Sequence, residues 1–310
     1  MIPDSWKRPQ TRPIVFSYVI DWALVVVMAI IFFMIDRIQP FHREFSLNDP
    51  NLMHTYALED SVPVWLLAVL CAVIPAVIIA FMATFIYKRA LDLNHGLLGL
   101  FLSLALCAMI TDTVKITVGR PRPDLIARCQ PPADAHDPHF GLSNYTICTV
   151  DPSTPIMIDG FKSFPSGHTS FSFAGLTFFS LYLAGKLNLF DQKGEGRTLK
   201  IFIFWIPILG ALLVGISRYR DYRHHWGDIL IGGIVGLICA IFSYHQYYPP
   251  LSQGGNPYNG RILRHNQNNH FDEESQQIEE ESQQHMPSYR HDDDNHDTNH
   301  PPSPTSIKVI

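Results

Sequence analysis

The chain has 310 residues, of which 47% are hydrophobic and only 16% are charged, below the roughly 25% that is usual in soluble domains. Its last 63 residues, 248–310, contain 12 apolar residues and carry a net charge of −6, so residues 1–247 are rich in apolar residues and carry a net charge of +1. This composition excludes a wholly soluble globular protein and a nucleic-acid-binding protein, which would need a basic surface without long apolar runs.

Six apolar stretches interrupt residues 1–247, and a helix needs about 20 apolar residues to cross a bilayer. They are 14–34, 62–87, 97–118, 170–185, 201–216 and 229–247. The fourth and fifth are short, but helix-compatible flanking residues extend them. Buried helices of a soluble protein are the alternative, and six such segments would leave too few polar faces to meet water. The sequence therefore predicts an all-α integral membrane protein with six transmembrane helices.

Two basic residues mark the end of the third predicted span. Lys115 and Arg122 are seven residues apart, and Pro123 ends the stretch. This spacing places two cations at the membrane surface. Taken alone, the pair is explained as well by long basic side chains that reach for the interface as by a binding function.

The long connection 119–167 carries features of an oxidising compartment. It contains Cys129 and Cys148, whereas the other three cysteines lie in predicted spans. A disulfide between these two cysteines would suit a lumen or the cell exterior, and two free thiols are the alternative. Asn144 begins the only N-x-S/T sequon of the chain and is a candidate glycosylation site.

A turn with a histidine precedes the fourth predicted span. Pro165, Ser166 and Gly167 are typical of a turn, and Ser166 is expected to be the N-cap of the helix that follows. Backbone N–H groups at a helix start favour a phosphate, and Gly167 permits close approach of the backbone. His168 is then placed where it can donate a proton. An ordinary capped helix with an interfacial histidine is the alternative.

The third cluster lies between the fifth and sixth predicted spans. It consists of Ser217, Arg218, His224 and Asp228. If the sixth helix starts early enough, His224 and Asp228 share one helical face at i and i+4. A carboxylate bonded to one imidazole nitrogen fixes the tautomer and makes the other nitrogen a better nucleophile. Interfacial charge pairing is the alternative.

All three clusters lie at span ends on the same predicted face of the membrane. Together they supply three cations, a serine, a helix N-terminus, two histidines and a carboxylate, which is a phosphate-binding set with a nucleophile and an acid. The clusters lack the grouped carboxylates of a magnesium site and the Cys/His set of a zinc site. We therefore expect no metal and no cofactor, with the cations neutralising developing charge.

The distribution of basic residues orients the chain in the membrane. Six spans put both termini on one side, which carries eleven Lys and Arg residues against ten on the other. Eight of those ten lie in the two loops beside the three clusters, where anion binding would account for them. Setting these aside, the positive-inside rule places both termini in the cytosol and residues 119–167 outside or in a lumen.

The segment 248–310 has the composition of a disordered chain. It is rich in Gln, Asn, His, Asp, Glu and Pro and shows neither helical nor strand periodicity. We therefore divide the chain into a six-helix membrane domain, 1–247, and a disordered acidic cytosolic tail, 248–310.

The three clusters carry a resemblance to a known family. Lys115-x6-Arg122-Pro123, Pro165-Ser166-Gly167-His168 and Ser217-Arg218-x5-His224-x3-Asp228 resemble, in order and spacing, the three signature motifs of the type-2 phosphatidic acid phosphatase (PAP2) superfamily. The segments that follow Arg122, Asp159 and Asp221 look like those of fungal diacylglycerol pyrophosphate phosphatases, which belong to that superfamily. The resemblance covers about residues 1–250 and implies the PAP2-type bundle of six helices.

The resemblance implies a mechanism that needs no magnesium. His224 would attack the terminal phosphorus and form a phosphohistidine, Asp228 would orient His224, and His168 would protonate the leaving oxygen. Phosphate binding would fall to Lys115, Arg122, Ser166, Gly167 and Arg218. A second phosphate is a further candidate ligand for three nearby cations, Arg120, Arg220 and Arg223, which would otherwise meet anionic lipid.

The resemblance also implies a membrane lipid as substrate, with diacylglycerol pyrophosphate, phosphatidate and lysophosphatidate as candidates. A fungal vacuolar membrane is the implied location, with another endomembrane or the plasma membrane as alternatives; the oligomeric state stays open. Polyisoprenyl diphosphate or sphingoid-base phosphate would suit the same motifs. Vanadium haloperoxidases share the phosphate-binding set but are soluble. A non-catalytic membrane scaffold that recruits partners through its tail is a more distant alternative.

Overall fold

A computed structural model describes residues 12–190 and 197–258 of the chain, and the predicted tail from residue 259 onward lies outside these ranges. Within the described residues the chain is helical, and its β-structure amounts to one isolated bridge between Phe45 and Ser143. The prediction of an all-α fold is therefore confirmed for this part of the chain.

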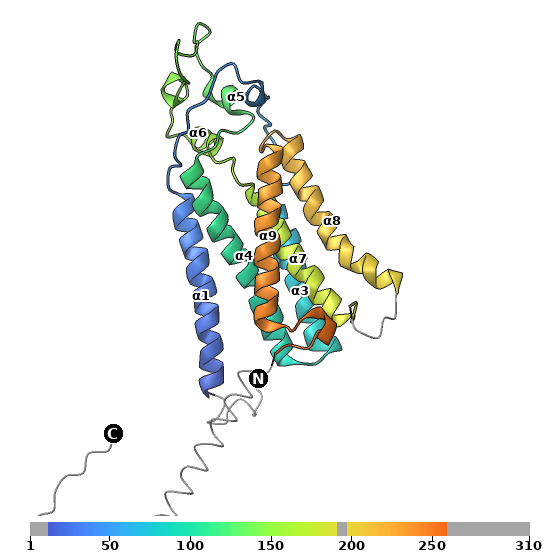
Figure 1. The fold of residues 1–310 in the computed structure, drawn as a ribbon. Coiled ribbons are helices and arrows are strands. Elements are labelled where there is room, and N and C mark those ends of the chain that lie inside the picture. Colours follow the sequence, from blue (N-terminus) through green and yellow to red (C-terminus); the bar gives the residue numbers. More distant parts are fainter. Residues whose placement is uncertain (1–11, 191–196, 259–310) are drawn as a thin grey trace, which may run out of the picture. The chain divides into compact units, whose positions relative to one another are not determined.

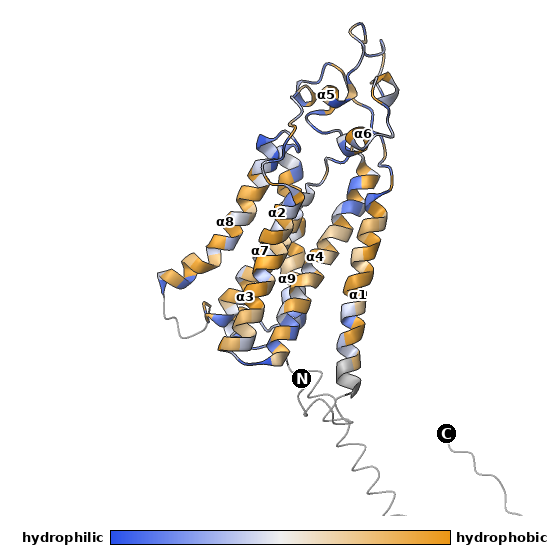
Figure 2. Cartoon of the chain, turned by 180° about the vertical axis from the view of Figure 1, so that it is seen from behind, coloured by the Kyte–Doolittle hydropathy of each residue, from blue (hydrophilic) through white to orange (hydrophobic). Residues whose placement is uncertain are grey.

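Five helices in the described residues are long and apolar enough to cross a membrane. They are α1 (Arg12–Asp36), the continuous run α2 (Val64–Ala68), η4 (Val69–Val73), α3 (Ile74–Phe81) and η5 (Met82–Ile86), then α4 (Ala90–Val118), α8 (Thr198–Arg220) and α9 (Trp226–Tyr247). Apolar residues run along most of α1 and α8, and hydrophilic residues gather in the loops beyond the helix ends (Figure 2). These helices account for five of the six predicted spans.

The fourth predicted span is helix α7 (Gly167–Lys186), which packs among α4, α8, α9 and the run from α2 to η5. It packs most extensively against α9 and α8, and then against α4 (Figure 1). A Cβ atom at Gly236 of α9 would lie only 2.4 Å from the Ser170 carbonyl oxygen, so the two backbones are in close contact. Thr111 of α4 donates a hydrogen bond to Ser170 Oγ at 2.9 Å. Small and hydroxyl-bearing residues therefore make α7 less apolar than the other long helices. That α7 crosses the membrane stays a prediction.

Helix α1 lies beside α4 and makes its main contacts with that helix. Near one end, Trp22 donates a hydrogen bond to Asn94 at 3.0 Å, and Tyr18 is hydrogen-bonded to His95 at 2.7 Å. Because α1 packs mainly on one neighbour, its remaining surface faces either the surroundings or the cavity described below.

The loops at one end of the bundle form a small folded cap (Figure 1). It contains η3 (Pro50–Leu52), α5 (Leu125–Cys129), η6 (Tyr145–Ile147) and α6 (Pro155–Gly160) around an apolar cluster. A disulfide joins Cys129 to Cys148. Gly119 ends α4 with φ at +58°, and a Cβ there would collide with the Phe41 carbonyl, so this turn requires glycine.

The packed part of the chain extends past the predicted start of the tail at residue 248. Tyr248 donates a hydrogen bond to Asp92 Oδ1 at 3.0 Å, and Lys186 donates one to the Gly255 carbonyl at 2.7 Å. Lys186 also forms an ion pair with Asp92 at 2.6 Å. These contacts hold η7 (Leu251–Gln253) and its neighbours against the ends of α4 and α7.

Candidate active site

The three motifs meet at one end of the bundle, as the sequence predicts. Ser166, before α7, donates its backbone N–H to the Asp228 carbonyl at 3.0 Å. Arg120, after α4, donates from Nη1 to Asp228 Oδ1 at 2.7 Å. The backbone N–H of Ser163 donates to the Arg120 carbonyl at 3.1 Å. Direct hydrogen bonds therefore join the ends of α4, α7 and α9.

A cavity of about 710 Å³ opens at this junction. Six of the eight predicted site residues line it: Lys115, Arg122, Gly167, His168, Arg218 and His224. The other two, Ser166 and Asp228, are fully buried and support the wall. Ser166 is the predicted N-cap of α7, and its Oγ accepts hydrogen bonds from the backbone and side chain of Thr169.

The cations of the cavity are paired with carboxylates. Lys115 contacts Asp112 at 3.1 Å, and Arg122 contacts Asp159 at 2.6 Å. Arg122 Nε is buried and, among the described residues, has no hydrogen-bond partner. A buried donor of this kind is costly unless a ligand satisfies it, so Arg122 is poised to bind an anion in the cavity.

The imidazole of His224 is held by the backbone. Its Nδ1 donates a hydrogen bond to the Ser163 carbonyl at 2.7 Å. A carbonyl oxygen only accepts, so Nδ1 carries the proton and Nε2 keeps a lone pair. Burial, together with the charges of Arg122 and Lys115, holds the pKa of His224 well below its ordinary value. The ring is therefore neutral at neutral pH, with an unprotonated Nε2.

Asp228 does not contact this ring in the way that the i, i+4 spacing predicts. Its Oδ2 lies 4.0 Å from His224 Nδ1 and instead accepts hydrogen bonds from Ser163 Oγ at 2.6 Å and from the His225 backbone N–H at 3.0 Å. The physical reason is the helix start, because α9 begins at Trp226 and leaves His224 outside the helix. Asp228 forms a capping box with His225, and it reaches His224 only through Ser163.

His168 lies in the first turn of α7 and faces the same cavity. Its Nε2 donates a hydrogen bond to the Val62 carbonyl at 3.1 Å, which fixes the ring orientation. Gly167 beside it has little free space, since a Cβ there would lie 2.9 Å from Lys115 Nζ. The start of α7 therefore lies directly against the cationic end of the cavity.

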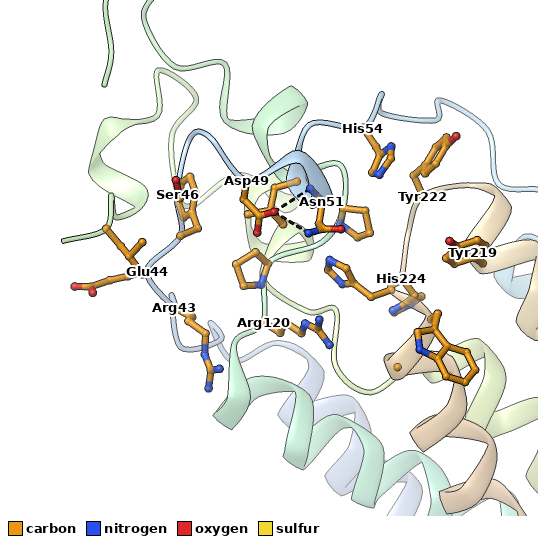
Figure 3. A pocket seen from close by; sticks show the side chains of 18 residues that line it. Arg43, Glu44, Ser46, Asp49, Asn51, His54, Arg120, Tyr219, Tyr222 and His224 are labelled. Carbon is orange, nitrogen blue, oxygen red and sulfur yellow. Dashed lines mark hydrogen bonds between the residues drawn. The ribbon is translucent and has the colours of Figure 1, made fainter. Parts of the chain in front are cut away.

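A second cavity, of about 730 Å³, lies on the other side of His224. Figure 3 shows Arg120 and His224 among its lining residues, with His54 and Tyr222 nearby. The rings of His54 and Tyr222 are stacked, with centroids 4.3 Å apart. His224 lines both cavities, and we call the second one the vestibule.

The three additional cations have different surroundings. Arg223 lines the first cavity and contacts Asp60 at 3.0 Å. Arg120 lines the vestibule and is paired with Asp228. Arg220 is exposed and donates to Ser61 Oγ at 2.6 Å. Only Arg223 of the three thus adds a cation to the first cavity.

The first cavity continues from its charged end into an apolar groove. The groove is lined by one side of α1, by α2 and η4, and by α4. Its apolar residues are Val25, Ala29, Phe32, Phe33, Val64, Leu67, Ala68, Ala72, Phe101, Leu104, Ala105 and Ala108. From Phe101 to Lys115 the rise of α4 spans about 20 Å, more than the roughly 15 Å depth of one bilayer leaflet.

Three residues that shape this site were not predicted from the sequence. Asp60 and Val62 come from the connection between α1 and α2, and Ser163 precedes the second motif. Val62 and Ser163 act through backbone carbonyls, for which the sequence carries no signal. Asp60 is one acid among several in its connection, and nothing in its spacing marks it. The described residues contain no group of three or more His, Cys, Asp or Glu that could hold a metal ion.

Comparison with known proteins decides the family. The model of the PAP2 superfamily matches residues 96–250, half of the chain, and includes all three motifs. The chain belongs to the PAP2 superfamily. Among known proteins, lipid phosphate phosphatase 2 of Arabidopsis thaliana is 42% identical over 231 residues, which are 74% of this chain and 77% of that protein.

Two fungal PAP2 relatives match a similar share of the chain. The probable diacylglycerol pyrophosphate phosphatase 1 of Schizosaccharomyces pombe is 39% identical over 232 residues, 74% of this chain and 81% of that protein. Diacylglycerol pyrophosphate phosphatase 1 of Saccharomyces cerevisiae is 33% identical over 235 residues, 74% of this chain and 80% of that protein. No solved structure matches the chain at a significant level. As a PAP2 phosphatase, the protein is a hydrolase.

Proposed function

We propose that the protein is a lipid phosphate phosphatase that removes the terminal phosphate of diacylglycerol pyrophosphate, phosphatidate and lysophosphatidate without a metal. The observation that supports this proposal most directly is that one cavity combines a charged end with an apolar groove. Its charged end contains Arg122, Arg218 and His224, and its other end is the apolar groove between α1 and α2. An amphiphile with a phosphate head and acyl chains matches both ends, and the names of the relatives agree with such a substrate.

The first chemical step uses His224. Its Nε2 attacks the terminal phosphorus and forms an N–P bond, while the bond from phosphorus to the leaving oxygen breaks. His168 gives a proton to that oxygen, a role worth about 10²–10⁴-fold in rate. Because Nε2 of His168 keeps its proton on the Val62 carbonyl, the proton given comes from Nδ1 of the imidazolium form, and His168 is neutral after the transfer. Water then attacks the phosphorus and gives a proton to His168, the N–P bond breaks, and inorganic phosphate leaves.

The remaining site residues hold the phosphate or support its binding set. Lys115, Arg122 and Arg218 neutralise the charge that develops on the phosphate oxygens, and the backbone at Gly167 adds N–H groups at the start of α7. Ser166 supports this helix start as its N-cap. We assign to Asp228 the positioning of His224 through Ser163, since its carboxylate binds Ser163 Oγ while the Ser163 carbonyl binds the ring.

We further propose that α7 is the sixth membrane helix, packed among α4, α8, α9 and the run from α2 to η5. Both termini then lie in the cytosol, and the active site faces a lumen or the cell exterior. Asn144 is exposed on the same side as the active site, and the Cys129–Cys148 disulfide there suits an oxidising compartment. A fungal-type vacuolar membrane fits these features, and glycosidase treatment of the membrane-bound protein would test the orientation.

Substrate competition tests the proposed function. Purified protein in detergent is given diacylglycerol pyrophosphate, phosphatidate, polyisoprenyl diphosphate, a sphingoid-base phosphate and the water-soluble glycerol 3-phosphate. We expect kcat/KM for the two glycerolipids to exceed that for glycerol 3-phosphate by about 100-fold or more, because each CH₂ buried in the groove contributes about 0.8 kcal/mol. A higher kcat/KM for the polyisoprenyl diphosphate or the sphingoid-base phosphate would show that the glycerolipids are not the preferred substrate class. If the protein released phosphate from none of the lipids, a non-catalytic scaffold would be favoured.

A further inference from the structure

The connection between α1 and α2 lies against the polar end of the first cavity. We call residues 56–62 the bridging segment; it belongs to none of the three motifs. Two of its residues, Tyr56 and Asp60, line the cavity itself. The Tyr56 ring lies between two guanidinium groups, those of Arg128 and Arg223, each 4.7 Å from the ring centroid. The segment is thus part of the cavity wall.

Asp60 joins two arginines of the third motif. Its Oδ1 lies 3.0 Å from Arg223 Nε and 3.3 Å from Arg218 Nη1. Arg223 also donates from Nη2 to the Ala57 carbonyl at 3.0 Å. Arg223 is therefore attached to the bridging segment by charge-assisted hydrogen bonds, and Arg218 is attached to it by an ion pair with Asp60.

The same segment fixes the other partner of Arg218. Arg218 Nη2 donates to Asp221 Oδ2 at 2.9 Å. Asp221 in turn accepts the Ser61 backbone N–H at 2.8 Å and the Ser61 hydroxyl at 2.5 Å. Val62, next in the chain, accepts from His168. One short segment thereby contacts both a phosphate-binding cation and the general acid of the proposed mechanism.

The arrangement of Arg218 explains why its orientation matters. Its side chain is only 2% exposed, and each terminal nitrogen carries two N–H groups. Asp221 accepts one N–H from Nη2 and the Asp60 carboxylate is paired with Nη1, so N–H groups of both nitrogens remain for phosphate. Two carboxylates, one beside each terminal nitrogen, restrain the orientation of the guanidinium more than a single partner would. Loss of Asp60 would leave this plane free to turn away from the cavity.

We propose that Asp60 is a positioning residue of the active site, which orients the Arg218 and Arg223 guanidinium groups toward the phosphate in the cavity. Asp60 acts on the substrate mainly through these arginines, so it affects the rate of the chemical step more than the binding of the lipid. This inference rests on the proposed lipid phosphatase function.

Two substitutions at Asp60 and one matched control test this role. Asp60→Ala removes both contacts, whereas Asp60→Asn keeps an oxygen that accepts from a guanidinium. Glu59→Gln removes the same charge from the exposed neighbouring residue and keeps every contact described above. With phosphatidate, we expect Asp60→Ala to lower kcat about tenfold or more and to change KM less than about threefold. The reason is that correctly oriented guanidinium N–H groups stabilise the charge of the transition state more than they stabilise the bound substrate. Asp60→Asn should recover part of kcat, and Glu59→Gln should match wild type.

A second arm separates positioning from a merely structural role. In an Arg218→Lys background, Asp60→Ala should lower kcat clearly less than in wild type, since coupled residues are not additive. Equal losses in both backgrounds, or wild-type kcat in Asp60→Ala, would overturn the proposal. If Asp60→Ala does not fold, Asp60→Asn decides: kcat equal to that of Glu59→Gln overturns the proposal, and a lower kcat supports it. If the wild-type protein itself released no phosphate from phosphatidate, the result would instead count against the proposed lipid phosphatase function.

Discussion

His224 donates its Nδ1 proton to the backbone carbonyl of Ser163 at 2.7 Å. This contact fixes the tautomer that leaves Nε2 unprotonated for the proposed attack on phosphorus, and a side-chain substitution at Ser163 would leave the carbonyl in place. Asp228 contacts Ser163 of this pair, and its carboxylate accepts a hydrogen bond from Ser163 Oγ at 2.6 Å. The nucleophile is therefore oriented by the backbone, with the carboxylate as support for the loop that presents it.

The low pKa of His224 makes stability depend on pH. Burial, then Arg122 and Lys115, lower this pKa in the folded state, so the unfolded chain takes up the proton first as pH falls through about 6.5. Protonation of the unfolded state lowers stability on the acidic side. We expect Tm to fall more between about pH 7.5 and pH 5.5 for the wild type than for His224→Gln, which lacks this group. Equal falls in Tm would contradict a lowered pKa.

Gly167 has no room for a side chain beside Lys115. A Cβ there would lie 2.9 Å from Lys115 Nζ, so Gly167→Ala should displace the ammonium group from the phosphate site. We expect kcat to fall about tenfold, a fraction of the 10²–10³-fold that loss of an electrostatic donor costs. Gly227→Ala is the matched control, because a Cβ there meets nothing within 4 Å. Similar kcat values for the two variants would contradict this placement of Lys115.

The apolar groove should select for acyl chains. Ala29 of α1 lines the groove, so Ala29→Phe should fill part of it and raise KM for a long-chain phosphatidate. A KM increase of about fivefold corresponds to roughly 1 kcal/mol of lost apolar contact. A short-chain phosphatidate should be affected less. Ala23→Phe, on an exposed part of the same helix, is the control. Equal effects of Ala29→Phe on both chain lengths would place the acyl chains elsewhere.

The disulfide should stabilise the loops around the site. Cys129 and Cys148 are 19 residues apart, and closing a loop of this length contributes about 3 kcal/mol by restricting the unfolded chain. Replacing both with serine should therefore lower Tm by several degrees. A reductant should lower the Tm of the wild type and leave that of the double variant unchanged. A wild-type Tm that is insensitive to reductant would argue against the bond.

The sequence predicted the parts of this fold that depend on composition. The five apolar helices were predicted because lipid-facing residues are uniformly apolar, and the shared end of the three motifs followed from counting spans. Helix α7 was harder to recognise as a span, because its neighbours cover it and permit Ser170 and Ser172 on its surface. The segment after residue 247 was assigned to the tail, although Tyr248 and Lys186 tie residues 248–258 to the bundle.

The site was predicted in its residues but only partly in its contacts. Lys115, Arg218 and His224 share one cavity, as their motifs indicate. The expected contact between Asp228 and His224 depended on a helix that includes both, and α9 begins after His224. The role of Asp60 could not be predicted from the sequence, because the bridging segment has no periodicity and its contacts depend on tertiary structure alone.

The central claim is a covalent intermediate on His224. Protein purified in detergent, in excess EDTA, would be mixed with diacylglycerol pyrophosphate labelled in its terminal phosphate, quenched within milliseconds and analysed for phosphohistidine, beside His224→Ala and the neighbouring control His225→Ala. We predict acid-labile label on His224 in the wild type and in His225→Ala, with neither label nor phosphate release in His224→Ala. Phosphate release by His224→Ala at the wild-type rate, or label carried by another residue, would contradict the account.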